Sequence, residues 1–330
     1  MLCKRRTVLA AIAAVIGTVP LRGFAREQGV GIRKIGILSG SQAPPPGTPS
    51  GVARELRSYG FEEGRNLLIE RRYSGGSPDK ASAMARELIE IGVEVVLAQG
   101  NTSIAAAQQA THSVPIVMAF GIAPVEAGFI KSLARPGGNI TGNAFHTPET
   151  GAKILDLLRE AAPKARRATM LWNPTRPGYE AYQTVLAEVA QKRGVTLEFI
   201  GVVQPAGLPQ ALQFLEARLP DFLFVANDIS IETGTPQIAD LARRRKLPSI
   251  GTDPRWVKAG GLFYYGPDED EAFTGACRQV ARILNGARPQ DLPVEQPSKY
   301  RFIINARTAR AIGFTLTESL QLRADQIIDG

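Results

Sequence analysis

The side chains best placed for chemistry are small polar residues that directly follow short apolar runs. In the first half, an apolar run at 93–98 is followed by Gly100-Asn101-Thr102-Ser103. Glycine allows a ligand to approach the backbone closely, and the three polar residues offer donors where a helix would begin. The positive end of a helix dipole favours anions, so this segment could hold a carboxylate or a small phosphate. Ordinary N-capping by Asn101 or Thr102 explains the same residues, and the sequence leaves both roles open.

Amides and carboxylates occupy the equivalent positions in the second half. Asn173 follows an apolar run at 168–172, and Asn227-Asp228 follows one at 222–226. Asp228 and Asp253 could accept hydrogen bonds from a ligand ammonium or hydroxyl, although Asp also caps helices routinely. Aromatic side chains nearby could line an apolar pocket or simply belong to the core. The complete set of candidate ligand-binding residues is Ser39, Ser41, Gly100, Asn101, Thr102, Phe120, Gly121, Asn173, Asn227, Asp228, Asp253 and Tyr264.

Signatures of common enzyme classes are missing from the sequence. There is no G-x-G-x-x-G fingerprint, no G-x-x-x-x-G-K-[ST] phosphate loop and no G-x-S-x-G nucleophile elbow. The two histidines, His112 and His146, are far apart, and no cysteine or carboxylate cluster has metal-ligand spacing. The sequence therefore predicts a protein without a metal, without a cofactor and without catalytic activity.

The elements that must position these residues alternate between strand and helix from residue 33 onward. Strands are predicted at 34–38, 67–73, 93–98 and 115–119, and the pattern restarts with strands at 168–172, 197–203 and 222–226. Their apolar runs lack strict alternation, as expected for parallel sheets covered by helices on both faces. Ligands bind beyond the carboxyl ends of such strands, where the candidate residues stand. We therefore expect an α/β protein with doubly wound parallel sheets.

The length of the chain favours two lobes joined by a hinge. Without its first 25 residues the chain has 305 residues, which exceeds the size at which single cores usually stop growing. The segment 135–142 is rich in glycine and is interpreted as the first hinge crossing, and the pattern changes again near Gly260-Gly261. The expected clamshell has one lobe at 31–145 plus 262–290 and a second at 146–261 plus 291–330.

Residues 1–25 have the pattern of an export signal. Lys4, Arg5 and Arg6 precede an apolar run at 8–19, and small residues follow at Gly23 and Ala25. The Arg5-Arg6 pair resembles a twin-arginine signal, but an ordinary secretory signal also carries such charges. We therefore expect a periplasmic protein, exported by either route. Loss of the segment lowers the formal net charge from +8 to +4, so nucleic acid is not an expected partner.

Four stretches of the sequence resemble those of the ABC-transporter substrate-binding proteins often described as tryptophan/tyrosine transport system binding proteins. The resemblance extends over roughly residues 33–330 in the same order. The stretches that carry it are Gly64-Arg65-Asn66-Leu67-Leu68-Ile69-Glu70, the run 133–142, Leu171-Trp172-Asn173-Pro174, and Asp291-Leu292-Pro293-Val294-Glu295-Gln296-Pro297 with the following 302–305. The resemblance is specific for the family and much less so for the ligand.

The resemblance implies a type I periplasmic binding fold with three crossovers, closing on a ligand, in a monomer. It implies that residues 100–103 hold a carboxylate, with Ser39 and Ser41 nearby. Asn173, Asn227 and Asp228 would approach from the other lobe, with Asp228 as the partner of an ammonium group. One departure stands out: relatives commonly have Gly-Asp-Pro-Val where this chain has Gly121-Ile122-Ala123-Pro124-Val125. An acid is missing there, so an aromatic amino acid ligand does not follow from the resemblance.

The leading hypothesis is an exported solute-binding protein that captures a small organic ligand, amino-acid-like or another small carboxylate. It would deliver this ligand to an ABC permease in the membrane. A periplasmic sensor that docks on a membrane receptor would use the same fold, and nothing in the sequence separates the two. An exported hydrolase or isomerase, acting through Asp228 or Asp253, is the third hypothesis.

Overall fold

The computed structural model describes residues 31–48 and 50–329, so the predicted export signal at residues 1–25 lies outside the described residues. The first sheet has five parallel strands in the order β2-β1-β3-β4-β5. We call this sheet and the helices packed on it lobe 1. The strands are β1 (Arg33–Ser39), β2 (Leu67–Tyr73), β3 (Val95–Gln99), β4 (Ile116–Ile122) and β5 (Ile140–His146).

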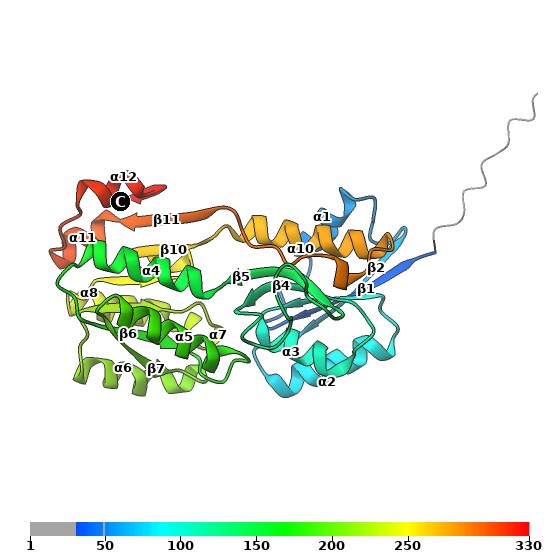
Figure 1. Cartoon of the computed structure of the whole chain (residues 1–330), viewed down its shortest axis with the longest axis horizontal. Helices are drawn as coiled ribbons and strands as arrows, with labels where there is room; N and C mark the ends of the chain where they lie inside the picture. Colours follow the sequence, from blue (N-terminus) through cyan, green and yellow to red (C-terminus); the bar gives the residue numbers. More distant parts are fainter. Residues whose placement is uncertain (1–30, 49, 330) are drawn as a thin grey trace, which may run out of the picture. The chain divides into compact units, whose positions relative to one another are not determined.

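Helices cover both faces of the lobe 1 sheet. They are α1 (Gly51–Arg57), α2 (Pro78–Glu90), α3 (Asn101–Ala110) and α10 (Glu269–Leu284). One apolar core joins α1 and α10 to the sheet, and a second core on the other face joins α2 and α3 to it. Figure 1 shows α10 running beside α1, although more than 200 residues separate them in the chain. Strand residues that alternate between two buried faces explain the continuous apolar runs of the sequence.

The second sheet has seven strands in the order β12-β11-β10-β9-β8-β6-β7, and with its helices it forms lobe 2. Its strands are β6 (Arg167–Trp172), β7 (Thr196–Gly201), β8 (Phe222–Val225), β9 (Ser249–Gly251), β10 (Phe263–Pro267), β11 (Tyr300–Asn305) and β12 (Gln326–Ile328). All described pairings are parallel except that of β10 with β11. The predicted class, two α/β lobes built on parallel sheets, is confirmed apart from this antiparallel pair.

Helices also cover both faces of the lobe 2 sheet. They are α4 (Pro148–Ala161), α5 (Tyr179–Lys192), α6 (Leu208–Ala217), α7 (Ile229–Glu232), α8 (Thr235–Arg244), α9 (Arg255–Lys258), α11 (Ala306–Ile312) and α12 (Glu318–Arg323), with a short 3-10 turn at Pro205–Gly207. A second 3-10 turn, Pro289–Asp291, follows α10 and contacts β5 of lobe 1. Among the described residues, no helix is long and apolar enough to cross a membrane.

The chain passes between the lobes three times, and two of the passages differ from the predicted boundaries. The predicted range 262–290 for lobe 1 includes β10, but β10 pairs with β9 and β11 in the lobe 2 sheet. The predicted range 291–330 for lobe 2 includes Leu292 and Val294, which are buried in the lobe 1 cores. Glu295 also exchanges backbone hydrogen bonds with β5. Contacts with residues distant in the sequence assign β10 to lobe 2 and residues 292–295 to lobe 1. The local sequence pattern does not reveal these contacts.

An irregularity in β4 shapes the edge of lobe 1 that faces the site. The register with β5 shifts between Met118 and Ile122, and Phe120 in this stretch has a φ of 62°. Gly142 on β5 has a φ of 123°, and a Cβ there would lie 2.3 Å from the Met118 carbonyl oxygen. Bulges of this kind redirect side chains at the ends of strands. Phe120 thereby lines the pocket described below.

A candidate ligand-binding site between the two lobes

A cavity of about 440 Å³ lies between the carboxyl ends of the strands of both lobes. This volume is within the range of small-molecule sites. Eight of the twelve predicted site residues line it: Ser39, Ser41, Gly100, Asn101, Thr102, Phe120, Asn227 and Asp228. They come from the ends of β1, β3, β4 and β8, as expected for ligands that bind beyond parallel strands.

The remaining four predicted residues do not line the cavity. Gly121 is buried where β4 approaches β5, and Tyr264 is buried in a lobe 2 core with its hydroxyl donating to the Pro267 carbonyl at 3.3 Å. Asn173 lies behind the wall, where its amide donates to Asp228 at 3.2 Å. Asp253 accepts from the Arg255 guanidinium at 2.9 Å. Three of these side chains therefore support neighbouring groups, and Gly121 permits a close backbone approach.

On the lobe 1 side, the start of α3 is held rigidly. Gly100 precedes the helix with a φ of 80° and a ψ of 158°, a conformation that is essentially restricted to glycine. The Asn101 amide accepts from the backbone N–H of Ile122 and donates to its carbonyl oxygen, both at 2.8 Å. It also donates to the Pro177 carbonyl of lobe 2 at 2.8 Å. Asn101 therefore fixes the helix and joins the lobes, so its amide nitrogen has no further hydrogen to offer a ligand.

Small hydroxyls complete this polar part of lobe 1. Ser39 and Ser41 share a hydrogen bond of 2.9 Å at the end of β1. Ser103, in the first turn of α3, is fully buried, and its hydroxyl has no hydrogen-bond partner among the described residues. Gly40 lies beside this hydroxyl. An anion near the start of α3 would meet hydroxyls and the positive end of the helix.

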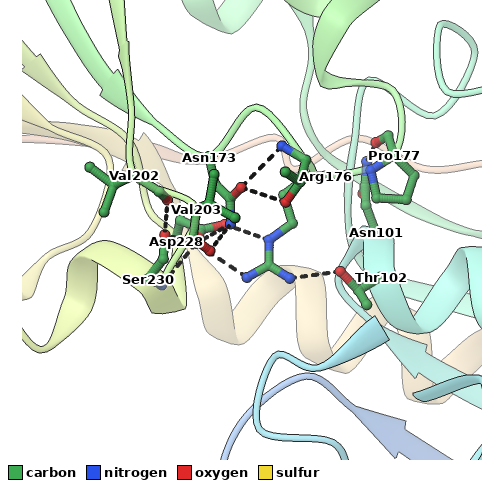
Figure 2. A network of polar contacts seen from close by, with 10 residues as sticks. Asn101, Thr102, Asn173, Arg176, Pro177, Val202, Val203, Asp228 and Ser230 are labelled. Carbon is green, nitrogen blue, oxygen red and sulfur yellow. Dashed lines mark hydrogen bonds and ion pairs between the residues drawn. The ribbon is translucent and has the colours of Figure 1, made fainter. Parts of the chain in front are cut away.

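On the lobe 2 side, an ion pair between Arg176 and Asp228 dominates. The Arg176 Nε donates to Asp228 Oδ2 at 2.7 Å and Nη2 donates to Oδ1 at 3.2 Å. The third guanidinium nitrogen, Nη1, donates to the Thr102 hydroxyl of lobe 1 at 2.7 Å. Figure 2 shows the guanidinium placed between Asp228 and Thr102. The Arg176 side chain therefore links Asp228 of lobe 2 to Thr102 of lobe 1, the two predicted ligand-binding residues.

The carboxylate of Asp228 is already saturated with donors. Oδ1 also accepts from the backbone N–H and the hydroxyl of Ser230, and from Asn173. Burial acts to raise the pKa of Asp228, but the Arg176 guanidinium and the Ser230 donors bring that pKa below its ordinary value. Burial acts to lower the pKa of Arg176, but the hydrogen bonds to Asp228 and the negative charge of Asp228 together raise that pKa above its ordinary value. Both groups are charged at neutral pH, and Asp228 has Arg176 as its partner where the resemblance implied a ligand ammonium.

Apolar side chains form the rest of the wall. Phe120 and Phe145 meet edge to face at 5.2 Å between ring centres, and Ile122, Tyr179 and Ile229 also line the cavity. His146, the last residue of β5, stacks its edge against Phe145, and burial lowers the pKa of His146 to about 4. Its ring is therefore neutral at pH 7. The cavity combines a polar part near α3 with an apolar part near β4 and β5.

Four charged residues of the cavity, Arg176, Glu232, Arg255 and Glu269, were missed by the sequence analysis. Arg176 stands four residues after β6, Glu232 ends α7, and Arg255 begins α9. Arg255 pairs with Asp253 and Glu232, and Glu269 begins α10. Burial and the nearby Asp253 carboxylate raise the pKa of Glu269. Arg176, Glu232 and Arg255 lie four or more residues beyond the strand that precedes them, whereas Glu269 lies only two residues beyond β10 and was overlooked.

Comparisons with known proteins agree with this architecture. The family model described as "ABC transporter substrate binding protein" matches residues 47–328. A tyrosine-binding protein of Clostridioides difficile is 25% identical over 99% of this chain and 96% of its own length. A conserved domain protein from Vibrio cholerae has a TM-score of 0.82 at 25% identity, over 90% of this chain and 99% of that one.

A domain from Streptococcus, solved in complex with L-Trp, has a TM-score of 0.79 at 24% identity and covers 90% of this chain and 99% of that one. More distant neighbours include a leucine-binding protein from Thermotoga maritima, with a TM-score of 0.54, which supports the type I periplasmic binding fold. The matched family consists of binding proteins and not of enzymes. The chain belongs to the ABC transporter substrate binding protein family.

Proposed function

We propose that this protein is the exported solute-binding component of an ABC importer and captures a small organic ligand in the cavity between its lobes. The ligand class is amino-acid-like or another small carboxylate. The cavity of about 440 Å³ between the lobes supports this proposal most strongly. Polar groups line it near α3, and apolar groups line it near β4 and β5. A few convergent polar groups with apolar walls are typical of small-molecule sites.

Closure of the lobes would couple to binding. Arg176 of lobe 2 contacts Thr102 of lobe 1, and Asn101 of lobe 1 contacts the Pro177 carbonyl of lobe 2. A ligand stabilises a closed form only through contacts that an open form lacks. A ligand held by both cavity faces supplies such contacts, so it would shift the protein toward the closed form that a permease recognises.

The relatives support an aromatic or apolar ligand body. The curated relative is named a tyrosine-binding protein, and the Streptococcus structure contains L-Trp. In this chain, Phe120, Phe145 and Tyr179 offer aromatic surface to the cavity. Contacts between aromatic rings are favourable beyond their burial of area. We therefore propose that the ligand presents an apolar or aromatic body to this wall.

The protein would then act outside the cytoplasm, as a monomer that binds to a membrane permease. Residues 1–25 carry the sequence pattern of an export signal. Expression of the full chain with subcellular fractionation tests this part. We expect a periplasmic product shortened after residue 25, and a cytoplasmic product of full length would contradict the predicted export.

Replacing Arg5 and Arg6 by lysine distinguishes the two export routes. The ordinary secretory route needs only positive charge and should tolerate the change, whereas the twin-arginine route should not.

A thermal-shift screen tests the binding function itself. The purified protein is heated with amino acids, small organic acids and nucleobase-like compounds in turn. A ligand that binds only the folded state raises its stability by about 2.7 kcal/mol at 100 times its dissociation constant. We expect at least one small carboxylate to raise the melting temperature. If no solute does, the assignment as a solute-binding protein is rejected.

A further inference from the structure

We propose that the ligand is a carboxylate that lacks an α-ammonium group, with its carboxylate bound by Arg176 and its apolar body directed toward Phe120 and Phe145. This inference deepens the proposed function and rests on it. It reverses the expectation for an amino acid, in which Asp228 would take the ligand ammonium. The hydrogen bonds of Arg176 and Asp228, and the positions of the other cavity acids, Glu232 and Glu269, support this inference.

Arg176 has donors left for a ligand. A guanidinium has five N–H groups, and the hydrogen bonds to Asp228 and Thr102 use one each on Nε, Nη1 and Nη2. The remaining two, one on each terminal nitrogen, have no acceptor among the residues that the structure describes. Two N–H groups on neighbouring nitrogens suit a carboxylate, which can accept both at once. Arg176 lines the cavity, and Asp228 fixes its orientation.

Asp228 has no place for an ammonium group. Its side chain is only 4% exposed and accepts from Arg176, Asn173 and Ser230. A ligand ammonium could reach Asp228 only by displacing the guanidinium, which is itself 13% exposed and would then lose its partner. Removing one partner from a buried ion pair is strongly unfavourable. The carboxylate that sequence reasoning assigned to an ammonium therefore serves to hold a cation of the protein.

Of the other acids of the cavity, Glu232 pairs with Arg255, and Glu269 follows a strand that is not adjacent to β6. Arg255 pairs with Glu232 and Asp253, and the largest charge effects on Glu269 come from Asp253 and Arg255. Glu269 follows β10, which is three strands from β6 in the lobe 2 sheet. At about 4.8 Å per strand, β10 and β6 are about 14 Å apart in the sheet. An α-ammonium is bonded to the same carbon as its carboxylate, so a ligand held by Arg176 does not bring that ammonium to Glu269.

The strand ends of lobe 1 and α3 supply no counter-charge for an ammonium beside Arg176, and the acid of lobe 1 that lines the cavity, Glu269, begins α10. Ile122, the last residue of β4, lines the cavity with an apolar side chain. The Thr102 hydroxyl, in the first turn of α3, lies beside Arg176, and the positive end of this helix favours an anion there. Ser103 adds a buried hydroxyl without a partner among the described residues. The start of α3 and Arg176 therefore both favour a negative group at this part of the cavity.

Strand order directs the body of the ligand. In the lobe 1 sheet, β3 leads to α3, and β4 and β5 follow it in order. Phe120 and Ile122 end β4, and Phe145 and His146 end β5. A ligand with its carboxylate near α3 therefore extends over one to two strand spacings, roughly 5–10 Å, along an apolar wall. This length suits a phenyl- or indole-bearing acid.

Calorimetric titration of the purified full-length protein with three matched compounds tests the inference. The compounds are L-phenylalanine, 3-phenylpropionate and 2-phenylethylamine, which carry both charged groups, the carboxylate alone and the ammonium alone. A second series uses the corresponding indole compounds. We expect the carboxylates to bind at least about tenfold more tightly than the amino acids, since burying an unpaired ammonium is costly. The amines should not bind measurably.

A double variant locates the carboxylate. Arg176→Gln with Asp228→Asn removes both charges and leaves no buried ion unpaired, so it is more apt to fold than a single variant. The matched control is Arg193→Gln with Asp156→Asn, because Arg193 holds Asp156 through Nε and Nη2 in the same way outside the cavity. We expect the cavity variant to lose about 10- to 100-fold in carboxylate affinity. The control should keep it.

The outcomes separate this inference from the proposed function. Tighter binding of the amino acids than of the carboxylates overturns the inference and leaves a solute-binding protein. Carboxylate binding that survives in the folded cavity variant overturns the role of Arg176. If neither series nor any compound of the thermal-shift screen binds, both the inference and the proposed function are rejected.

Discussion

The two faces of the cavity differ in how they carry charge. The lobe 1 strand ends and α3 present hydroxyls, backbone N–H groups and aromatic rings, and their one titratable side chain, His146, is neutral at pH 7. Lobe 2 presents Arg176, Asp228, Glu232 and Arg255, and each of these has an opposite charge beside it. The lobe 1 strand ends and α3 therefore offer shape and weak polarity, with Glu269 of α10 as the one acid of lobe 1 among the lining residues, while lobe 2 offers charges that are already paired. A charged ligand then binds to the paired group that still has N–H donors without an acceptor. That group is Arg176.

The largest effect should follow from breaking the charged face. In Arg176→Gln, Asp228 stays buried without its cation, and we expect the free energy of unfolding to fall by about 3–5 kcal/mol. Arg193→Gln breaks a more exposed pair of similar geometry and should cost at most about 1 kcal/mol. Urea denaturation of the two variants measures the difference. Equal losses of unfolding free energy would contradict the claim that the Arg176–Asp228 pair is more strongly shielded from solvent than the Arg193–Asp156 pair.

The neutral ring of His146 should make the lobe 1 face sensitive to acid. Its pKa is about 4 in the folded protein and near 6.5 in the unfolded chain, so the unfolded state binds a proton more readily. Stability is therefore complete above pH 6.5 and is lost as pH falls toward 4, by about 3 kcal/mol for this group. Urea denaturation at pH 7 and pH 4.5 should show a smaller loss in His146→Gln than in the unchanged protein. An identical pH dependence would refute the assignment to His146.

The start of α3 should depend on Gly100. Its φ of 80° with a ψ of 158° is strained for any residue with a Cβ, although no atom lies within 4 Å of that position. Gly100→Ala should therefore lower the unfolding free energy by about 1–3 kcal/mol through backbone strain alone. Gly207→Ala is the control, because Gly207 has a φ of −80° and equally open space. Similar melting temperatures for the two variants would argue against this conformation.

The contact between the two faces should give the smallest effect. Thr102→Val removes the hydroxyl that accepts from Arg176 Nη1. We expect a loss of about 1 kcal/mol in unfolding free energy. Thr184→Val, on the exposed side of α5, makes the same chemical change away from the cavity. If both variants unfold at the same urea concentration, the contact between the lobes contributes no measurable stability.

Sequence reasoning located the neutral face better than the charged one, for a physical reason. Ser39, Gly100, Thr102 and Phe120 were found because strand ends in a parallel sheet follow from apolar runs and from the topology that these runs imply. The partner of Asp228 was missed because Arg176 is 52 residues away in the chain, and only the folded β6–α5 loop brings the two side chains together.

The lobe boundaries show the same limit. The apolar run at Phe263–Pro267 resembles any other strand in the sequence. Its place in the lobe 2 sheet depends on pairing with β9 on one side and β11 on the other. A local pattern identifies a strand, but the choice of neighbours depends on surfaces that form from distant parts of the chain.

A crystal structure with 3-phenylpropionate bound tests the central claim most directly. We predict that the carboxylate lies between the terminal nitrogens of Arg176 and the start of α3, within hydrogen-bond distance of the guanidinium, with the phenyl ring against Phe120 and Phe145. The Arg176–Asp228 pair should remain intact. A ligand bound elsewhere, or one whose carboxylate points away from Arg176, would contradict the account.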